Sequence, residues 1–260
     1  MSVPTLFEPV SFRSITARNR ITVAPMCQYS ADHGFGSDFH VQHLGARAFG
    51  GAGIVMAEAT AVQDIGRITH GCLGLWNDEQ FPLAKRLADI ITISNQRNDA
   101  YGGDLAGRSR FLMETIDAVR AVWPADLPLF VRLSCSDYKA GGPTIEDTVE
   151  LSRRLKARGD VDLIDCSSGG ITPDMRPPSL HPGYQVPFAD AIKHGAGIAT
   201  GAVGLIQDPQ HAAEIIGNRR ADLVFVARVM LADPAWPLRV AKALGVKVDY
   251  AIQYGRALLN

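Results

Sequence analysis

The stretch that decides the fold reads Ile21-Thr22-Val23-Ala24-Pro25-Met26-Cys27-Gln28-Tyr29. Its first four residues, Ile21–Ala24, are apolar or β-branched on both faces, which predicts a strand buried in a parallel sheet. Pro25 removes a backbone donor and ends the strand ladder, so the backbone beyond it can meet a ligand. Because the C-terminal ends of parallel barrel strands build active sites, Cys27 and Tyr29 would bring a sulfur and a hydroxyl to that rim. A buried cysteine without a function fits this stretch equally well.

Further runs of the same kind predict five more strands, with helical patterns between them. The other expected strands are Gly53–Ala57, Leu129–Leu133, Asp162–Cys166, Gly197–Thr200 and Asp222–Val226, and the expected helices are Phe39–Phe49, Arg108–Val122, Thr144–Arg158 and one that begins at Asp208-Pro209. Strands that alternate with helices indicate βα units, so the fold class is α/β, a TIM (β/α)8-type barrel. Such a barrel has eight strands, so the six that are visible predict an incomplete one.

The composition indicates a globular protein with a large core. Of the 260 residues, 47% are hydrophobic and 20% are charged, which argues against disorder. The net charge of -1, without a basic block, argues against nucleic-acid binding and favours a small-molecule enzyme or a neutral binding module. The sequence contains no internal repeat or Gly/Ser linker, so we expect a single domain over residues 1–260.

The chain shows none of the usual targeting signals. Met1–Arg20 lacks the apolar core of a signal peptide, and no apolar run is long enough to cross a bilayer. We therefore expect a cytoplasmic protein without a membrane partner. The four cysteines form no C-x-x-C pair, so we expect neither a zinc site nor a disulfide framework.

Arg132 interrupts the apolar run Leu129–Leu133. Arginine is seldom fully buried without a partner, and at a strand end its guanidinium can face an anion or a reduced ring system. An ion pair with Asp162 or Asp165 is the alternative.

Small residues follow the last two strands. Gly201-Ala202-Val203-Gly204 comes after one and Ala227-Arg228 after the other. Small residues let backbone amides approach a phosphate, and barrels often bind phosphate after strands seven and eight. Turn punctuation is the alternative interpretation of the glycines.

Two other motifs resemble binding sites without their context. His40 and His43 have a spacing that could hold a metal, but no third ligand stands at a suggestive distance, so we expect a packed or solvated helix face and no metal. Gly50-Gly51-Ala52-Gly53 precedes a strand, whereas a dinucleotide loop follows one, so we interpret it as a helix-to-strand turn.

Motifs spread over the chain resemble those of the old yellow enzymes. They are Leu6-Phe7-Glu8-Pro9, Asn19-Arg20-Ile21, Pro25-Met26-Cys27-Gln28-Tyr29, Glu58-Ala59-Thr60, Ser94-Asn95-Gln96-Arg97, Tyr101-Gly102-Gly103, Arg108-Ser109-Arg110-Phe111 and Pro182-Gly183-Tyr184-Gln185-Val186-Pro187-Phe188. The pattern is most similar to the bacterial branch with a cysteine beside the flavin, the YqjM or xenobiotic-reductase type. The resemblance covers two blocks, Leu6–Ile91 and Ser94–Arg256.

The resemblance implies a TIM barrel that holds FMN non-covalently at the C-terminal mouth. By position, the flavin would be lined by Ala24, Pro25, Met26, Cys27 and Ala59, with Arg132 near its pyrimidine end, and its phosphate would be held by Gly204, Ala227 and Arg228. Cys27 would tune the redox potential and Tyr29 would touch the substrate. Arg256 resembles an arginine that enters the neighbouring subunit's site, which implies a homodimer or homotetramer.

The implied reaction is that of an ene-reductase. NADPH or NADH reduces FMN, and hydride then passes to the β-carbon of an activated alkene such as an enone, enal or nitroalkene, while a proton reaches the α-carbon.

The chain departs from the family at the junction of about residues 91–94. The third and fourth βα units are missing there, with the family's Gln-Leu-x-His-x-Gly-Arg signature, the His/His or His/Asn pair that grips a carbonyl oxygen, and the tyrosine that donates a proton. Three explanations are open: the sequence omits a mobile internal stretch of an otherwise whole enzyme, a natural or engineered deletion leaves a protein that binds flavin weakly without catalysis, or an unusual closure, for example by a partner subunit, replaces the missing strands. A phosphate-binding barrel of other chemistry is a further alternative.

Overall fold

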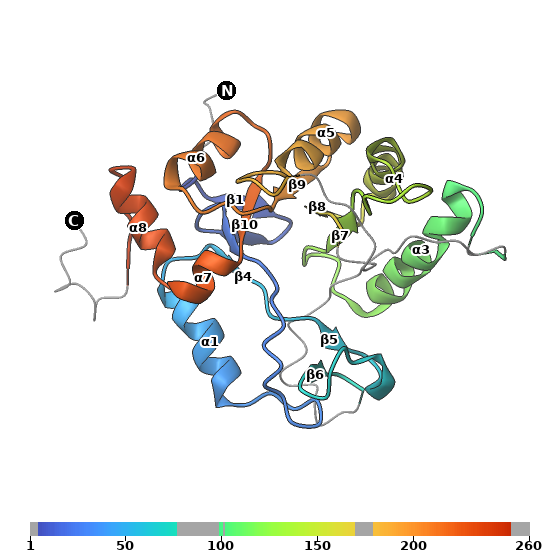
Figure 1. The fold of residues 1–260 in the computed structure, drawn as a ribbon, viewed down its shortest axis with the longest axis horizontal. Helices are drawn as coiled ribbons and strands as arrows, with labels where there is room; N and C mark the ends of the chain where they lie inside the picture. The colour runs from blue at the N-terminus through green and yellow to red at the C-terminus, as the bar shows by residue number, and fades with distance from the viewer. Residues whose placement is uncertain (1–4, 77–98, 101, 170–178, 251–260) are drawn as a thin grey trace.

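The computed structural model describes residues 5–76, 99–100, 102–169 and 179–250. All six predicted strands form one parallel sheet in the order β4-β3-β10-β9-β8-β7 (Figure 1). They are β3 (Ile21–Val23), β4 (Ile54–Val55), β7 (Phe130–Ser134), β8 (Leu163–Ser167), β9 (Ala199–Ala202) and β10 (Leu223–Val226). The sheet curls as part of a barrel and is consistent with the predicted incomplete α/β barrel.

Helices cover the outside of the curl (Figure 1). They are α1 (Asp38–Phe49), α3 (Leu105–Val122), α4 (Ile145–Arg158), α5 (Val186–Ala196), α6 (Pro209–Gly217), α7 (Arg228–Ala232) and α8 (Trp236–Ala243). The predicted starts of two helices are confirmed, because the side chains of Thr144 and Asp208 accept backbone N–H groups of their first turns. The predicted turn at Gly50–Gly53 is also confirmed, since Gly50 caps α1 and the chain then enters β4.

Smaller elements lie beside the main sheet, where no strand was predicted. β1 (Val10–Phe12) and β2 (Ile15–Ala17) form an antiparallel hairpin. β5 (Thr60–Ala61) and β6 (Leu73–Gly74) form a short parallel ladder around the 3-10 turn η1 (Asp64–Gly66). Each strand has two or three residues, too few for a period of alternation to stand out in the sequence.

Two hydrophobic clusters lie on opposite faces of the sheet. Val131 and Leu133 of β7 belong to the cluster under the helices, whereas Phe130 belongs to the cluster inside the curl. There Phe12 of the hairpin meets Phe130 edge-to-face, with ring centroids 5.0 Å apart. Both faces of β3, β8 and β10 are therefore buried, which explains their apolar composition.

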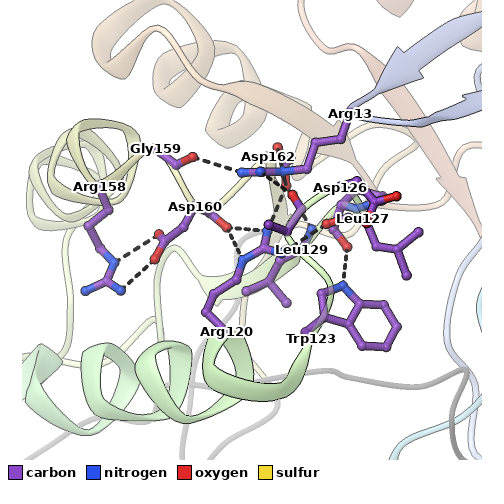
Figure 2. A network of polar contacts seen from close by, with 12 residues as sticks. Arg13, Arg120, Trp123, Asp126, Leu127, Leu129, Arg158, Gly159, Asp160 and Asp162 are labelled. Carbon is purple, nitrogen blue, oxygen red and sulfur yellow. Dashed lines mark hydrogen bonds and ion pairs between the residues drawn. The ribbon is translucent and has the colours of Figure 1, made fainter.

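Charged residues bind the hairpin to the N-terminal ends of β7 and β8 (Figure 2). Arg13 Nε donates to both oxygens of Asp162, at 2.7 and 2.8 Å, and Arg120 approaches the same carboxylate at 3.2 Å. The backbone N–H of Leu129 donates to Asp162 as well, at 2.9 Å. This network lies at the N-terminal ends of the strands, on the face of the barrel opposite the C-terminal ends where the predicted site residues lie.

The described sheet ends at two edges, β4 and β7. The chain between them includes residues 77–98, which lie outside the described residues. The sequence also predicts a helix that ends near Ala88–Ile91, and this helix and the junction at residues 91–94 lie in that range.

Candidate active site

The predicted phosphate residues come together at the C-terminal ends of β9 and β10. Gly204, Ala227 and Arg228 line one cavity of about 110 Å³. Tyr184 and Gln185, from the turn before α5, form its other wall. The cavity thus combines a guanidinium with loop backbone at the rim of two parallel strands, which suits an anionic group.

Gly204 is required by the backbone at this cavity. Its φ of +116° is disfavoured for residues with a side chain, and a Cβ there would lie 3.0 Å from the backbone nitrogen of Gln185. The Gly204 carbonyl accepts the N–H of Gly183 at 2.6 Å. The glycine therefore keeps open a cradle that a side chain would fill, and the residues present fit the phosphate of FMN.

A hydrogen-bonded group not predicted from sequence stands behind this cavity. Gln185 Nε2 donates to Ser168 Oγ at 2.6 Å, and Ser168 Oγ shares a hydrogen bond with the Tyr138 hydroxyl at 2.8 Å. Burial raises the pKa of Tyr138, so its hydroxyl stays protonated. These residues lie on three separate loops, and only Gln185 stood in a motif of the family resemblance.

The segment after β3 forms the neighbouring part of the rim. The Ala24 N–H donates to the Val226 carbonyl at 3.0 Å, which joins this segment to the end of β10. Ala24 and Met26 line a second, smaller cavity of about 10 Å³, whereas Pro25 and Cys27 are half-buried and line neither cavity. Tyr29 is exposed.

The remaining predicted residues are placed as follows. Arg132 Nε donates to Asp165 Oδ2 at 2.6 Å, so the ion-pair alternative holds for Asp165; Asp162 binds Arg13 and Arg120 instead. The Arg132 side chain is 22% exposed and lines neither cavity. Ala59 is half-buried beyond β4, and Arg256 lies outside the described residues.

His40 and His43 take part in packing at the start of α1. His40 is buried beside Glu58, and His43 stacks on Phe39 with ring centroids 5.7 Å apart. Burial, together with the nearby positive charge of Arg47 and the ring of His40, lowers the pKa of His43 to about 4. Within the described part of the chain, no group of three or more His, Cys, Asp and Glu side chains could hold a metal ion.

The same described residues contain no helix that combines the length and the apolar character needed to cross a membrane.

Comparison with protein families gives one match that covers most of the chain. Residues 5–93 and 90–246 match the NADH:flavin oxidoreductase / NADH oxidase family. The NADPH dehydrogenase of Listeria innocua is 36% identical over 338 aligned positions, which cover 97% of this chain and 98% of that protein. The NADPH dehydrogenase of a Geobacillus species is 38% identical over 337 positions, with 96% and 98% covered. Both alignments are longer than the 260 residues of this chain, so the relatives contain positions without a counterpart here.

Solved structures share the fold at low sequence identity. An old yellow enzyme homologue from Zymomonas mobilis superposes with a TM-score of 0.74 at 17% identity, covering 96% of each chain. Morphinone reductase gives 0.73 at 17% identity, covering 95% of this chain and 91% of the other.

The relatives, the family match and the shared barrel lead to one assignment: the chain belongs to the NADH:flavin oxidoreductase / NADH oxidase family, the old yellow enzymes, whose members are FMN-dependent oxidoreductases.

Proposed function

We propose that this protein is an ene-reductase that binds FMN at the C-terminal rim of its barrel and reduces activated alkenes such as enones, enals and nitroalkenes. One observation carries the proposal: Gly204, Ala227 and Arg228, expected from the family resemblance to hold the FMN phosphate, line a single cavity. When bound, FMN supplies hydride transfer from NADPH or NADH to the β-carbon of the alkene.

Each residue would contact a different part of FMN. Arg228 would neutralise the phosphate, and the backbone around Gly204 and Ala227 would approach it closely. Arg132, kept in orientation by Asp165, would stabilise negative charge on the reduced ring. Ala24–Cys27 and Ala59 would line the flavin.

Two further residues would contact the substrate or a second subunit. Tyr29, which is exposed at the rim, would touch the alkene. Arg256 would reach the site of a second subunit, in a homodimer or homotetramer. A cytoplasmic location and assignment to the cysteine-bearing branch remain predictions.

A second candidate function is flavin binding without alkene reduction. It is favoured by the two family matches, which overlap at residues 90–93, and by the edges of the sheet, which among the described residues are β4 and β7. We propose that the chain is one domain with an internal deletion at about residues 91–94. The lost units would include the pair that polarises the substrate carbonyl and the proton donor, and loss of such donors costs about 10²–10³-fold in rate for each.

Flavin titration tests the phosphate site. We expect Arg228→Ala to weaken FMN binding about tenfold or more, because a charge-assisted contact to the phosphate is lost, and to leave riboflavin binding unchanged. Arg154→Ala, on the exposed face of α4, is the matched control. Equal losses for FMN and riboflavin would show that Arg228 does not bind the phosphate.

Two anaerobic half-reactions separate the candidate functions. With an ene-reductase, NADPH abolishes the visible flavin absorbance and cyclohexenone restores it. If absorbance is lost but cyclohexenone does not restore it, the second candidate is correct. If the protein binds no flavin, both are wrong and a phosphate-binding barrel of other chemistry remains.

A further inference from the structure

A buried pair of side chains is in contact with the segment that carries Cys27. His40 comes from the first turn of α1, and Glu58 follows β4 by three residues. Their side chains are 3% and 2% exposed, and His40 Nε2 is 3.2 Å from Glu58 Oε1. Buried ionisable groups are costly unless they are paired, so this pair calls for an explanation.

Hydrogen bonds from the backbone determine how the pair is oriented. The Ser37 N–H donates to His40 Nδ1 at 3.0 Å, so the ring proton is on Nε2, the nitrogen nearest to Glu58. The other carboxylate oxygen, Glu58 Oε2, accepts the N–H of Gln28 at 3.1 Å. A relay of contacts thus runs from the start of α1 through the end of β4 to the residue after Cys27.

The segment itself is held on both sides of Cys27. Gln28 donates its side-chain amide to the carbonyl of Met26 at 2.8 Å. The next residue, Tyr29, has a φ of +53°, in the left-handed region that a tyrosine seldom adopts. Such a conformation persists only where surrounding contacts determine it, and the Glu58–Gln28 contact is adjacent.

The space around the pair is too small for a ligand. The cavity lined by His40, Glu58, Met26 and Gln28 has a volume of about 10 Å³, the size of one water molecule. His40 Nε2 and Glu58 Oε1 each have no aligned hydrogen-bond partner within the described protein, so one water could serve both. The arrangement therefore suits a rigid support and not a binding site.

We infer that His40 and Glu58 are positioning residues, which fix the Met26–Tyr29 segment by joining the start of α1 to the Gln28 backbone. The inference rests on the proposed function, in which this segment lines the flavin and touches the substrate. Glu58 holds the backbone on which Cys27 and Tyr29 are presented, and His40 determines which oxygen of Glu58 is left for Gln28.

Glu58→Gln tests the relay with a nearly isosteric change. The substituted side chain has one oxygen and one NH₂ group in place of the two carboxylate oxygens. Its NH₂ group must therefore face either the Nε2–H of His40 or the N–H of Gln28, and in both cases two hydrogen-bond donors face each other. His40 cannot relieve this by moving its proton, because Nδ1 accepts from Ser37. His40→Asn keeps an acceptor for Ser37 but is too short to reach Glu58.

The first measurement is alkylation of Cys27 by iodoacetamide in the protein without added FMN, read by peptide mass spectrometry. We expect Glu58→Gln to change the rate at Cys27 about tenfold, the effect of losing a hydrogen bond to a charged group. The rates at Cys135 and Cys166, both 0% exposed, should stay at wild-type values. A merely structural role would raise all three together, which would overturn the inference. Glu150→Gln, an exposed carboxylate on α4, is the matched control.

The second measurement is FMN affinity by fluorescence titration. We expect Glu58→Gln and His40→Asn each to weaken FMN binding about tenfold, and the double variant to be no worse than Glu58→Gln, because the two residues act as a unit. Multiplying effects in the double variant would contradict the relay. If Glu58→Gln does not fold, His40→Asn carries the test by the same two criteria.

The outcomes distinguish the two proposals. If the wild type binds FMN and Glu58→Gln matches it in alkylation rate and in affinity, the inference is wrong and the proposed function stands. If the wild type binds no FMN, the proposed function is wrong, and the alkylation rates still decide whether the pair fixes the segment.

Discussion

Asp162 offers the sharpest test of how the barrel is held together. Its carboxylate accepts from Arg13, Arg120 and the Leu129 backbone, and these contacts join the hairpin, α3 and the start of β7 (Figure 2). The side chains of Asp162, Arg13 and Arg120 are 15%, 24% and 12% exposed, so solvent screens them only in part. Removal of the carboxylate leaves the Leu129 N–H without its acceptor, and it leaves Arg13 and Arg120 with backbone carbonyls as partners and no counter-charge from Asp162.

The expected cost follows from these contacts. Breaking a buried charge pair by removing one partner costs about 3–5 kcal/mol. Because Asp162 is 15% exposed and both arginines keep carbonyl partners, Asp162→Ala should lower the free energy of unfolding by about 3 kcal/mol, the low end of that range. This is a large fraction of the total stability of a typical domain, about 5–15 kcal/mol. Asp162→Asn keeps an acceptor for Leu129 and loses only the charge, so we expect a loss of about 1–2 kcal/mol.

Urea denaturation followed by circular dichroism measures both variants. The midpoint should fall without a change in the m-value. Asp126→Asn, an exposed carboxyl in the adjacent loop, should stay within about 0.5 kcal/mol of the wild type. FMN affinity should be unchanged, because the network lies on the face opposite the proposed site. A loss below about 1 kcal/mol for Asp162→Ala would refute the reasoning, since it would mean that solvent replaces these contacts.

Two further predictions concern pH and packing. His43 takes up a proton near pH 6.5 in the unfolded chain but only near pH 4 in the folded protein. The free energy of unfolding is therefore highest above pH 6.5 and falls as the pH drops towards 4. We expect a fall of about 1 kcal/mol, because solvent screens the partly exposed ring. Urea midpoints at pH 7 and pH 5 measure this fall, and in His43→Gln it should be smaller; equal falls would contradict it. Gly201→Ala should cost about 1–3 kcal/mol, because its Cβ would overlap the Phe225 ring inside the curl. Gly217→Ala, in α6 with open space around it, should instead gain about 0.5–1 kcal/mol in the same denaturation assay. Equal effects of the two alanines would show that packing at Phe225 is not decisive.

The main sheet could be predicted from the sequence because strands that are buried on both faces form continuous apolar runs. The run Leu223–Val226 is apolar throughout, and Thr144 and Asp208 mark helix starts by local chemistry. Such signals lie within a few residues of each other, so one sequence is sufficient to read them.

The site was predictable only in part, since its contacts join distant segments. Arg132 had two acidic candidates, and the choice of Asp165 depends on the register of β7 against β8, where the two residues are directly paired. The pairing of His40 with Glu58 depends on how α1 packs against the rim. Neither relation has a period or a spacing that a sequence displays.

The positions of the two edge strands of the described sheet bear on the proposed function. β3 is the first strand of the main sheet and β10 is the last, and the two pair directly in register. A barrel shortened at its ends would be open at this seam, whereas the described sheet ends at β4 and β7, which follow one another within it along the chain. Along the chain, these two edges of the described sheet flank the segment in which the proposed internal deletion lies.

The proposed phosphate site and Arg132 lie at different places in the described sheet. The phosphate cavity follows β9 and β10, and the Cys27 segment follows β3, so both stand at the intact seam. Arg132 stands on β7, an edge strand of the described sheet, and its ion-pair partner on the neighbouring strand is Asp165. Affinity for the phosphate should therefore survive changes at this edge better than the steps that depend on Arg132. Arg132→Lys should accordingly slow flavin reduction by NADPH more than it weakens FMN binding, because lysine keeps the charge and loses the planar fork.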